Sequence, residues 1–120
     1  MRLYRPVGQK ELDLIKMSEM TKFPPRLDWQ PIFYPVRNEE YASQIAKEWN
    51  TNDEFSGYVG YVLSFEISDQ YFSTFEIQNV GTSIHNELWV PAEELENFNR
   101  EINGKITIEK TYYDSQFQKL

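Results

Sequence analysis

The stretch YVGYVLSFEI, residues 58–67, sets the architecture of the chain because it carries the clearest strand pattern in the sequence. Alternate positions give the extended stretch one apolar face, made by Val59, Tyr61, Leu63, Phe65 and Ile67. Tyr58 and Val62 add apolar surface to the opposite face. A strand with apolar side chains on both faces is typically covered on both faces. We therefore predict that residues 58–67 form a central strand of a sheet.

Shorter strands and three helices are predicted on either side of this strand. The strands are expected at residues 2–7, 32–36, 75–80, 87–90 and 105–109, and the tail at 111–120 extends the last of them. The helices are expected at residues 9–20, 39–49 and 91–103, and residues 68–72 form a turn or a single helical turn. Asn38 caps the second helix, whereas Pro91 and Gly104 mark the first residue and the C-cap of the third.

The second helix has an apolar stripe, because Tyr41, Ile45 and Trp49 recur every four residues. The segment KFPPRLDWQP, residues 22–31, contains three prolines and is predicted to have no regular secondary structure. Phe23 and Trp29 are expected to anchor this loop to the core.

The order of the elements indicates the fold class. Strands cluster in the second half of the chain, which favours an α+β fold with a mixed or antiparallel sheet and about three helices. The chain has 120 residues, of which 40% are hydrophobic, and this suits a single domain that spans residues 1–120.

Composition excludes several classes of function. The chain has no cysteine and one histidine, so thiolate chemistry and a multi-histidine zinc site within one chain are excluded. The net charge of −7 opposes general binding to nucleic acids. No apolar run has the length of a membrane span, and the first residues lack the long apolar centre of a signal peptide, so we expect a cytoplasmic protein without membrane association.

Five polar residues are candidates for a functional site. His85 and Glu87 lie two positions apart at the start of a predicted strand, so their side chains share one face if both are extended. They form either a reactive pair or the polar end of a loop. Arg5 and Arg26 either grip a phosphate or carboxylate or are ordinary surface arginines. Tyr34 either stacks on a flat ligand ring or packs at the rim of the core.

Three blocks of the sequence together carry a resemblance to a known family. They are LYRPV at residues 3–7, PIFYPVRNEEYASQIAKEW at residues 31–49 and HNELWVPAEEL at residues 85–95. The chain resembles the small bacterial proteins labelled ADP-ribosylation/crystallin J1, and through them the ADP-ribosyltransferase fold. The resemblance to the small family covers nearly the whole chain.

The resemblance implies a fold and a set of roles. It implies an ADP-ribosyltransferase-like domain in which Arg5 binds ribose or phosphate and Tyr34 stacks on nicotinamide. Glu87 then binds a ribose hydroxyl and stabilises an oxocarbenium-like centre, and His85 assists proton transfer. The implied cofactor is NAD, used as a substrate, and no metal is implied.

Two hypotheses of function follow from the sequence. The first is a domain that binds NAD or an ADP-ribose-type nucleotide and transfers ADP-ribose to an acceptor that the sequence does not identify, with a protein acceptor as one candidate. The second is a non-catalytic nucleotide-binding or protein-interaction domain, such as an immunity or phage-type factor. The net charge of −7 and the aromatic residues Trp29, Tyr112 and Tyr113 motivate the second hypothesis.

Overall fold

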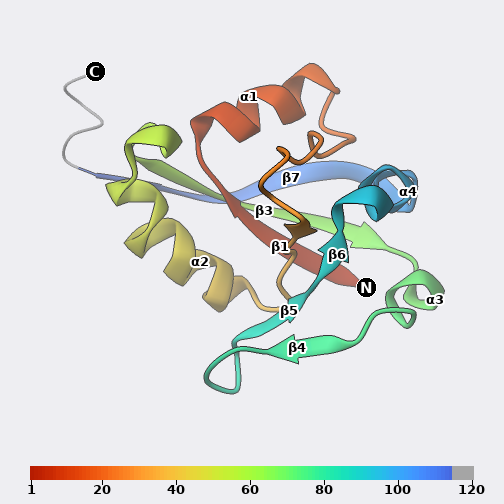
Figure 1. The fold of residues 1–120 in the computed structure, drawn as a ribbon. Helices are drawn as coiled ribbons and strands as arrows, with labels where there is room; N and C mark the ends of the chain where they lie inside the picture. Colours follow the sequence, from red (N-terminus) through yellow and green to blue (C-terminus); the bar gives the residue numbers. More distant parts are fainter. Residues whose placement is uncertain (115–120) are drawn as a thin grey trace.

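A three-stranded antiparallel sheet forms the centre of the structure (Figure 1), a computed structural model that describes residues 1–114. Its strands, in spatial order, are β1 (Arg2–Val7), β3 (Val59–Ile67) and β7 (Ile102–Tyr113). The stretch that dominates the sequence is thus the central strand, as predicted. It pairs with β1 through Leu3↔Phe65 and with β7 through Leu63↔Ile108.

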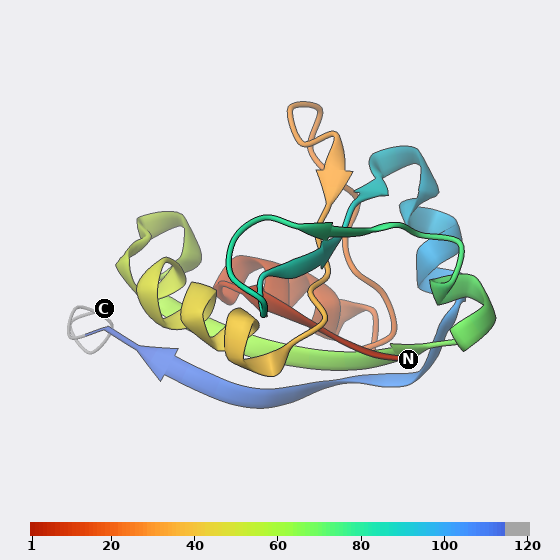
Figure 2. The same ribbon diagram turned by 90° about the horizontal axis from the view of Figure 1, so that it is seen from below.

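A second antiparallel ladder joins the free side of β1. It consists of two strand pairs, β2 (Ile32–Phe33) with β6 (Val90–Pro91) and β4 (Ile77–Asn79) with β5 (Asn86–Leu88). Phe33 pairs with Val90, and Val36 pairs with Glu87 in the same register. Val36 also pairs with Tyr4 of β1, so one residue connects the two parts of the sheet. Figure 2 shows the β4–β5 hairpin and β7 on opposite sides of the molecule.

Four α-helices complete the described part of the chain. They are α1 (Gln9–Met17), α2 (Glu39–Glu48), α3 (Asp69–Phe72) and α4 (Leu95–Arg100), with short 3₁₀ turns at Asn50–Asn52, Glu54–Ser56 and Ala92–Glu94. The chain is therefore α+β, and every strand pair is antiparallel. The helix additional to the three expected ones is α3, a single turn that begins after Ser68, whose side chain accepts a hydrogen bond from the Tyr71 amide.

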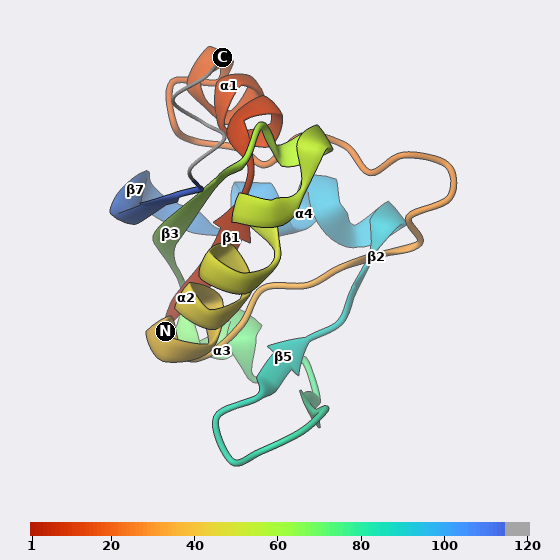
Figure 3. The same cartoon turned by 90° about the vertical axis from the view of Figure 1, so that its left-hand side faces the viewer.

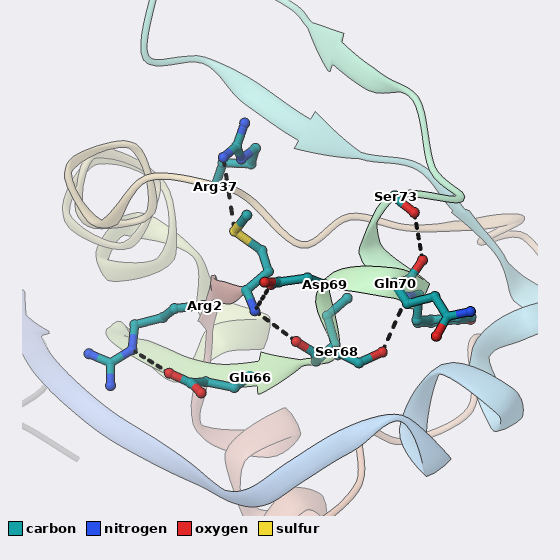
Figure 4. A network of polar contacts seen from close by, with 10 residues as sticks. Arg2, Arg37, Glu66, Ser68, Asp69, Gln70 and Ser73 are labelled. Atoms are coloured by element: carbon teal, nitrogen blue, oxygen red, sulfur yellow. Dashed lines mark hydrogen bonds and ion pairs between the residues drawn. The ribbon is translucent and has the colours of Figure 1, made fainter.

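A polar network beside α3 holds the first residues against the sheet (Figure 4). The amino group of Met1 donates to the Ile67 carbonyl and to Asp69 Oδ1, both at 2.8 Å. This amino group also lowers the pKa of the Asp69 carboxyl through hydrogen bonding and charge. Arg2 Nε lies 3.6 Å from Glu66 Oε1 on the paired strand.

The predicted third helix is wrong at both ends. Pro91 does not begin a helix, because it pairs with Ile32 as the last residue of β6 and the Ala92 amide donates to the Pro31 carbonyl. A 3₁₀ turn follows, and α4 begins only at Leu95. Gly104 is not a C-cap; it lies inside β7 with φ at +77°, a left-handed conformation that glycine adopts without strain.

The sheet separates two hydrophobic clusters. The larger cluster lies on the face of Leu3 and Leu63 and includes residues of α1 and α4. The smaller cluster lies on the face of Val62 and is closed by Ala42 and Ala46 of α2. Adjacent residues of β3 thus enter different cores, as the period of two requires.

The proline-rich loop at residues 22–31 has no regular structure, as predicted. Phe23 is buried and contacts the ring of Phe33, so this anchor is confirmed. The second anchor is wrong, because Trp29 is 76% exposed. Figure 3 shows the loop projecting on the side of the molecule away from β7. The predicted tail at 111–120 contributes residues 111–113 to β7, and residues 115–120 lie outside the described part.

Candidate functional site

Glu87 occupies β5, where both of its carboxylate oxygens accept hydrogen bonds. Tyr41 Oη on α2 donates to Oε2 at 2.5 Å, and Trp89 Nε1 donates to Oε1 at 3.0 Å. Glu87 pairs with Val36 and therefore points to the face of the sheet that α2 covers. Burial, reinforced by the bond to Glu87, raises the pKa of Tyr41 to about 12. The carboxylate is thus held between two aromatic donors.

His85 supports Tyr41 rather than touching Glu87. The two rings are stacked at 4.5 Å between centroids with 34° between their planes. The Thr82 amide donates to His85 Nδ1 at 3.1 Å, and His85 Nε2 lies 3.0 Å from Gln44 Oε1. Because Nδ1 accepts an N–H, the proton of the neutral ring belongs on Nε2, which then donates to Gln44.

Gly81 gives the imidazole of His85 its space. A Cβ atom at position 81 would overlap His85 Nδ1, so any larger residue there displaces the ring. The turn between β4 and β5 is therefore shaped around His85. The side chains of His85 and Glu87 both reach Tyr41, which places them on one side of the sheet, as the spacing predicts.

Tyr34 completes an aromatic frame near Glu87. It lies opposite Trp89 in the register of the ladder, and the two rings meet edge to face with centroids 6.3 Å apart. Tyr34 and Trp89 are 40% and 44% exposed, so the outer surface of the frame faces solvent. Trp89 links Tyr34 to Glu87, and the sequence candidates Tyr34, His85 and Glu87 share one surface.

Arg5 belongs to the other face of the sheet. Tyr4 faces α2, so Arg5, the next residue, points toward the larger cluster. Arg5 Nε and Nη2 donate to the two carboxylate oxygens of Glu11 at 2.6 and 2.9 Å. Its guanidinium also lies 4.6 Å from the centroid of the Phe33 ring. Arg5 in β1, Tyr34 just after β2 and Glu87 in β5 lie in neighbouring segments, yet Arg5 is directed away from the other two.

Arg26 lies beside Arg5. Its Cζ is 5.9 Å from the centroid of the same Phe33 ring. Burial lowers the pKa of the Arg26 guanidinium and the charge of Arg5 lowers it further, while Glu11 and Tyr34 partly oppose this. The candidate residues therefore form two groups, one around Glu87 and one around Phe33.

Sequence reasoning missed three residues of these groups: Glu11, Tyr41 and Trp89. A signal for Trp89 was present, because a residue two positions after Glu87 in a strand shares its face. Tyr41 was identified only as part of a helix stripe, and its contact with Glu87 spans 46 positions. Glu11 follows Arg5 by six positions across a turn, a spacing that carries no signal by itself.

Two surface hollows are present, and neither is lined by Glu87 or the two arginines, although Gln44, the partner of His85, lines the second. One has a volume of about 340 Å³ and is lined by residues of α4 and the start of β7, and the other, of about 390 Å³, lies between α2 and β7. Within residues 1–114, no group of three or more His, Asp or Glu side chains is arranged to hold a metal ion. The helices of the same part of the chain are too short or too polar to cross a bilayer.

The chain was compared with protein families, curated proteins and solved structures. No protein-family model, no curated protein and no solved structure matches the chain.

Proposed function

We propose that the chain is an ADP-ribosyltransferase-like protein that binds NAD through its nicotinamide ribose at Glu87. The observation that carries the proposal is the carboxylate of Glu87, held by Tyr41 and Trp89 and bordered by the exposed ring of Tyr34. The nicotinamide ring of NAD is flat and positively charged, and aromatic faces and a carboxylate both attract such a ring. Ribose hydroxyls are donors that a carboxylate accepts.

The same arrangement suits the chemistry of transfer. When the nicotinamide–ribose bond breaks, its electron pair leaves with nicotinamide and positive charge develops on the ribose. The carboxylate of Glu87 stabilises that charge electrostatically. An acceptor then forms the new bond to the ribose carbon and releases a proton to water. His85 contacts the ring of Tyr41, whose hydroxyl donates to Glu87, so the role that this proposal gives to His85 is to position Tyr41.

Isothermal titration with NAD tests the proposal. We expect Glu87→Gln to weaken NAD binding at least about tenfold, because hydrogen bonds to a charged acceptor become bonds to a neutral one. Glu93→Gln is the matched control, since Glu93 is exposed on the 3₁₀ turn Ala92–Glu94. Wild-type protein that shows no heat of binding at millimolar NAD, or equal affinity in Glu87→Gln, would contradict the proposal.

A non-catalytic binding domain is the second candidate. It is favoured by one observation, that protein donors already satisfy both oxygens of Glu87 without any ligand. Release of nicotinamide from NAD separates the two candidates, with water as the simplest acceptor. Release by the wild type that disappears in Glu87→Gln supports transfer. NAD binding without release supports the non-catalytic domain.

A further inference from the structure

The cluster around Phe33 has an uneven balance of charge. Two guanidinium groups, those of Arg5 and Arg26, lie 4.6 and 5.9 Å from the centroid of one ring. The carboxylate beside them, Glu11, gives both oxygens to Arg5. Two positive charges thus share one negative charge, and the cluster keeps a net charge of about +1.

Arg26 is the arginine of this cluster that has no carboxylate partner. Its Nε is buried and has no hydrogen-bond partner within residues 1–114. None of the ion pairs found in this part of the chain involves Arg26. A buried donor without an acceptor destabilises a fold, and such donors are rare. The fold therefore tolerates an unfavourable group at this point.

An arginine without a carboxylate partner is also unexpected in a chain this rich in acidic residues. The chain has 19 acidic residues against 12 Lys and Arg, so acceptors for an arginine are abundant. Neighbouring prolines at positions 24 and 25 restrict the backbone before Arg26, which keeps its side chain near Phe33. The weaker ring contact of Arg26 does not replace a hydrogen bond to Nε. Burial and the charge of Arg5 lower the pKa of Arg26, in keeping with two cations held close together beside one ring.

We propose that Arg26, with Arg5 beside it, is a receptor for the phosphoryl oxygens of a small phosphate-bearing molecule. A phosphate carries the charge that the cluster lacks, and its oxygens accept from the Nη groups of Arg26, which are not among the buried unpaired atoms, whereas the covered Nε only shows that no protein acceptor serves this side chain. Arg5 uses Nε and Nη2 for Glu11, which leaves Nη1 outside that ion pair. Arg5 and Phe33 lie on the opposite face of the sheet from Glu87, so the receptor does not rest on the binding of NAD there.

Titration of the full chain with sodium pyrophosphate tests this receptor. We expect wild-type protein to bind pyrophosphate, and Arg26→Gln to weaken that binding at least about tenfold. Arg26→Lys keeps the charge but loses the fork, so its affinity falls between the two. Arg100→Gln is the charge-matched control, because Arg100 is an exposed residue paired with Glu96. We expect its affinity to equal that of the wild type.

Parallel titrations identify the source of the phosphate. Tighter binding of ADP-ribose than of pyrophosphate, with both lost in Arg26→Gln, marks a nucleotide diphosphate as the ligand class. Equal binding of pyrophosphate and ADP-ribose marks the free anion. Absence of pyrophosphate binding at millimolar concentration, or equal affinity in Arg26→Gln, overturns the receptor. Titration of Glu87→Gln with NAD tests the proposed NAD site separately, because Glu87 is not part of the Arg26 receptor.

The melting temperature without ligand distinguishes a receptor from a structural arginine. We expect Arg26→Gln to melt at or above the temperature of the wild type, because the substitution removes an unpaired charge beside Arg5. Loss of pyrophosphate binding at an undiminished melting temperature supports the receptor. A melting temperature several degrees lower in both Arg26→Gln and Arg26→Lys assigns Arg26 to the core and overturns it.

Discussion

Tyr41 contacts both His85 and Glu87, two candidate residues that do not contact each other. Its ring stacks on His85, and its hydroxyl donates to Glu87. This hydroxyl is one of the two donors to the Glu87 carboxylate. Removing it leaves the ring and its packing in place, so Tyr41→Phe isolates the contribution of one hydrogen bond.

We expect Tyr41→Phe to lower the free energy of unfolding by about 1–2 kcal/mol, because Glu87 loses a charged hydrogen bond at a half-buried position. Urea unfolding at pH 7 measures the loss. Tyr71→Phe is the matched control, since Tyr71 donates to Glu94 at 2.9 Å away from the site. We expect a similar loss of stability in both variants and a change in NAD affinity only in Tyr41→Phe. Equal NAD affinities in the two variants would separate Tyr41 from ligand binding.

The same residue gives the stability a dependence on alkaline pH. The folded structure raises the pKa of Tyr41 from 10.0 to about 12, so folding favours the neutral phenol. This contribution is complete below pH 10 and is lost as the pH rises from 10 to 12. We expect the urea midpoint of the wild type to fall more steeply across this window than that of Tyr41→Phe. Parallel slopes for the two proteins would show that Tyr41 titrates alike in both states.

The candidate site was partly visible in the sequence at this scale. The spacing of His85 and Glu87 predicts that their side chains lie on the same side of the sheet. In the structure both side chains contact Tyr41. The contact itself depends on how α2 packs over β5, and no local pattern encodes that packing. Spacing therefore finds partners within one element and misses those on another.

At the scale of elements, α2 determines where Tyr41 stands. Asn38 caps this helix, since its side chain accepts a hydrogen bond from the Tyr41 amide at 3.2 Å. The cap thus acts on the backbone of the same residue whose hydroxyl reaches Glu87. Ala42 and Ala46 bring the helix close to the sheet, which is why both are fully buried while Trp49, expected in the stripe, is 61% exposed.

We expect Asn38→Ala to destabilise the fold by about 1 kcal/mol, because the first turn of α2 loses an acceptor for an otherwise unpaired amide. Asn38→Asp keeps an acceptor and serves as the control with near wild-type stability. Thermal unfolding followed by circular dichroism measures both variants. Hydrogen exchange of the Tyr41 amide adds a local readout, and it should be faster in Asn38→Ala alone. Unchanged exchange in Asn38→Ala would show that the cap does not order this turn.

The elements also show where local patterns are sufficient. The strand at β3 and the cap at Asn38 were predicted correctly, because alternation and capping act over a few residues. The segment from Pro91 to Gly104 was wrong because its start is decided by pairing with β2, almost sixty positions earlier in the chain. Proline at the start of a helix and proline at the end of a strand have the same local signature.

At the scale of the whole molecule, β3 contributes fully buried residues to both cores. Leu63 belongs to the larger cluster and Val62 to the smaller, and both are fully buried. Tyr41 packs against the smaller cluster, so the Glu87 surface depends on that core. Which core a residue enters follows from the register of the sheet, and this is why the sequence alone left the direction of Arg5 open.

We expect Leu63→Ala to lower the free energy of unfolding by about 2–5 kcal/mol and Val62→Ala by about 1–3 kcal/mol, in proportion to the methyl groups removed and the cavities left. Because β3 contributes to both cores, each variant should still unfold in one transition. Far-ultraviolet circular dichroism follows the sheet, and the fluorescence of Trp89, in a background where Trp29 and Trp49 are Phe, follows the second ladder. Coincident urea curves mean that the ladder bearing Glu87 unfolds together with the central sheet. An earlier fluorescence transition would show that this ladder unfolds separately, with the pairing of Val36 to Tyr4 as the boundary.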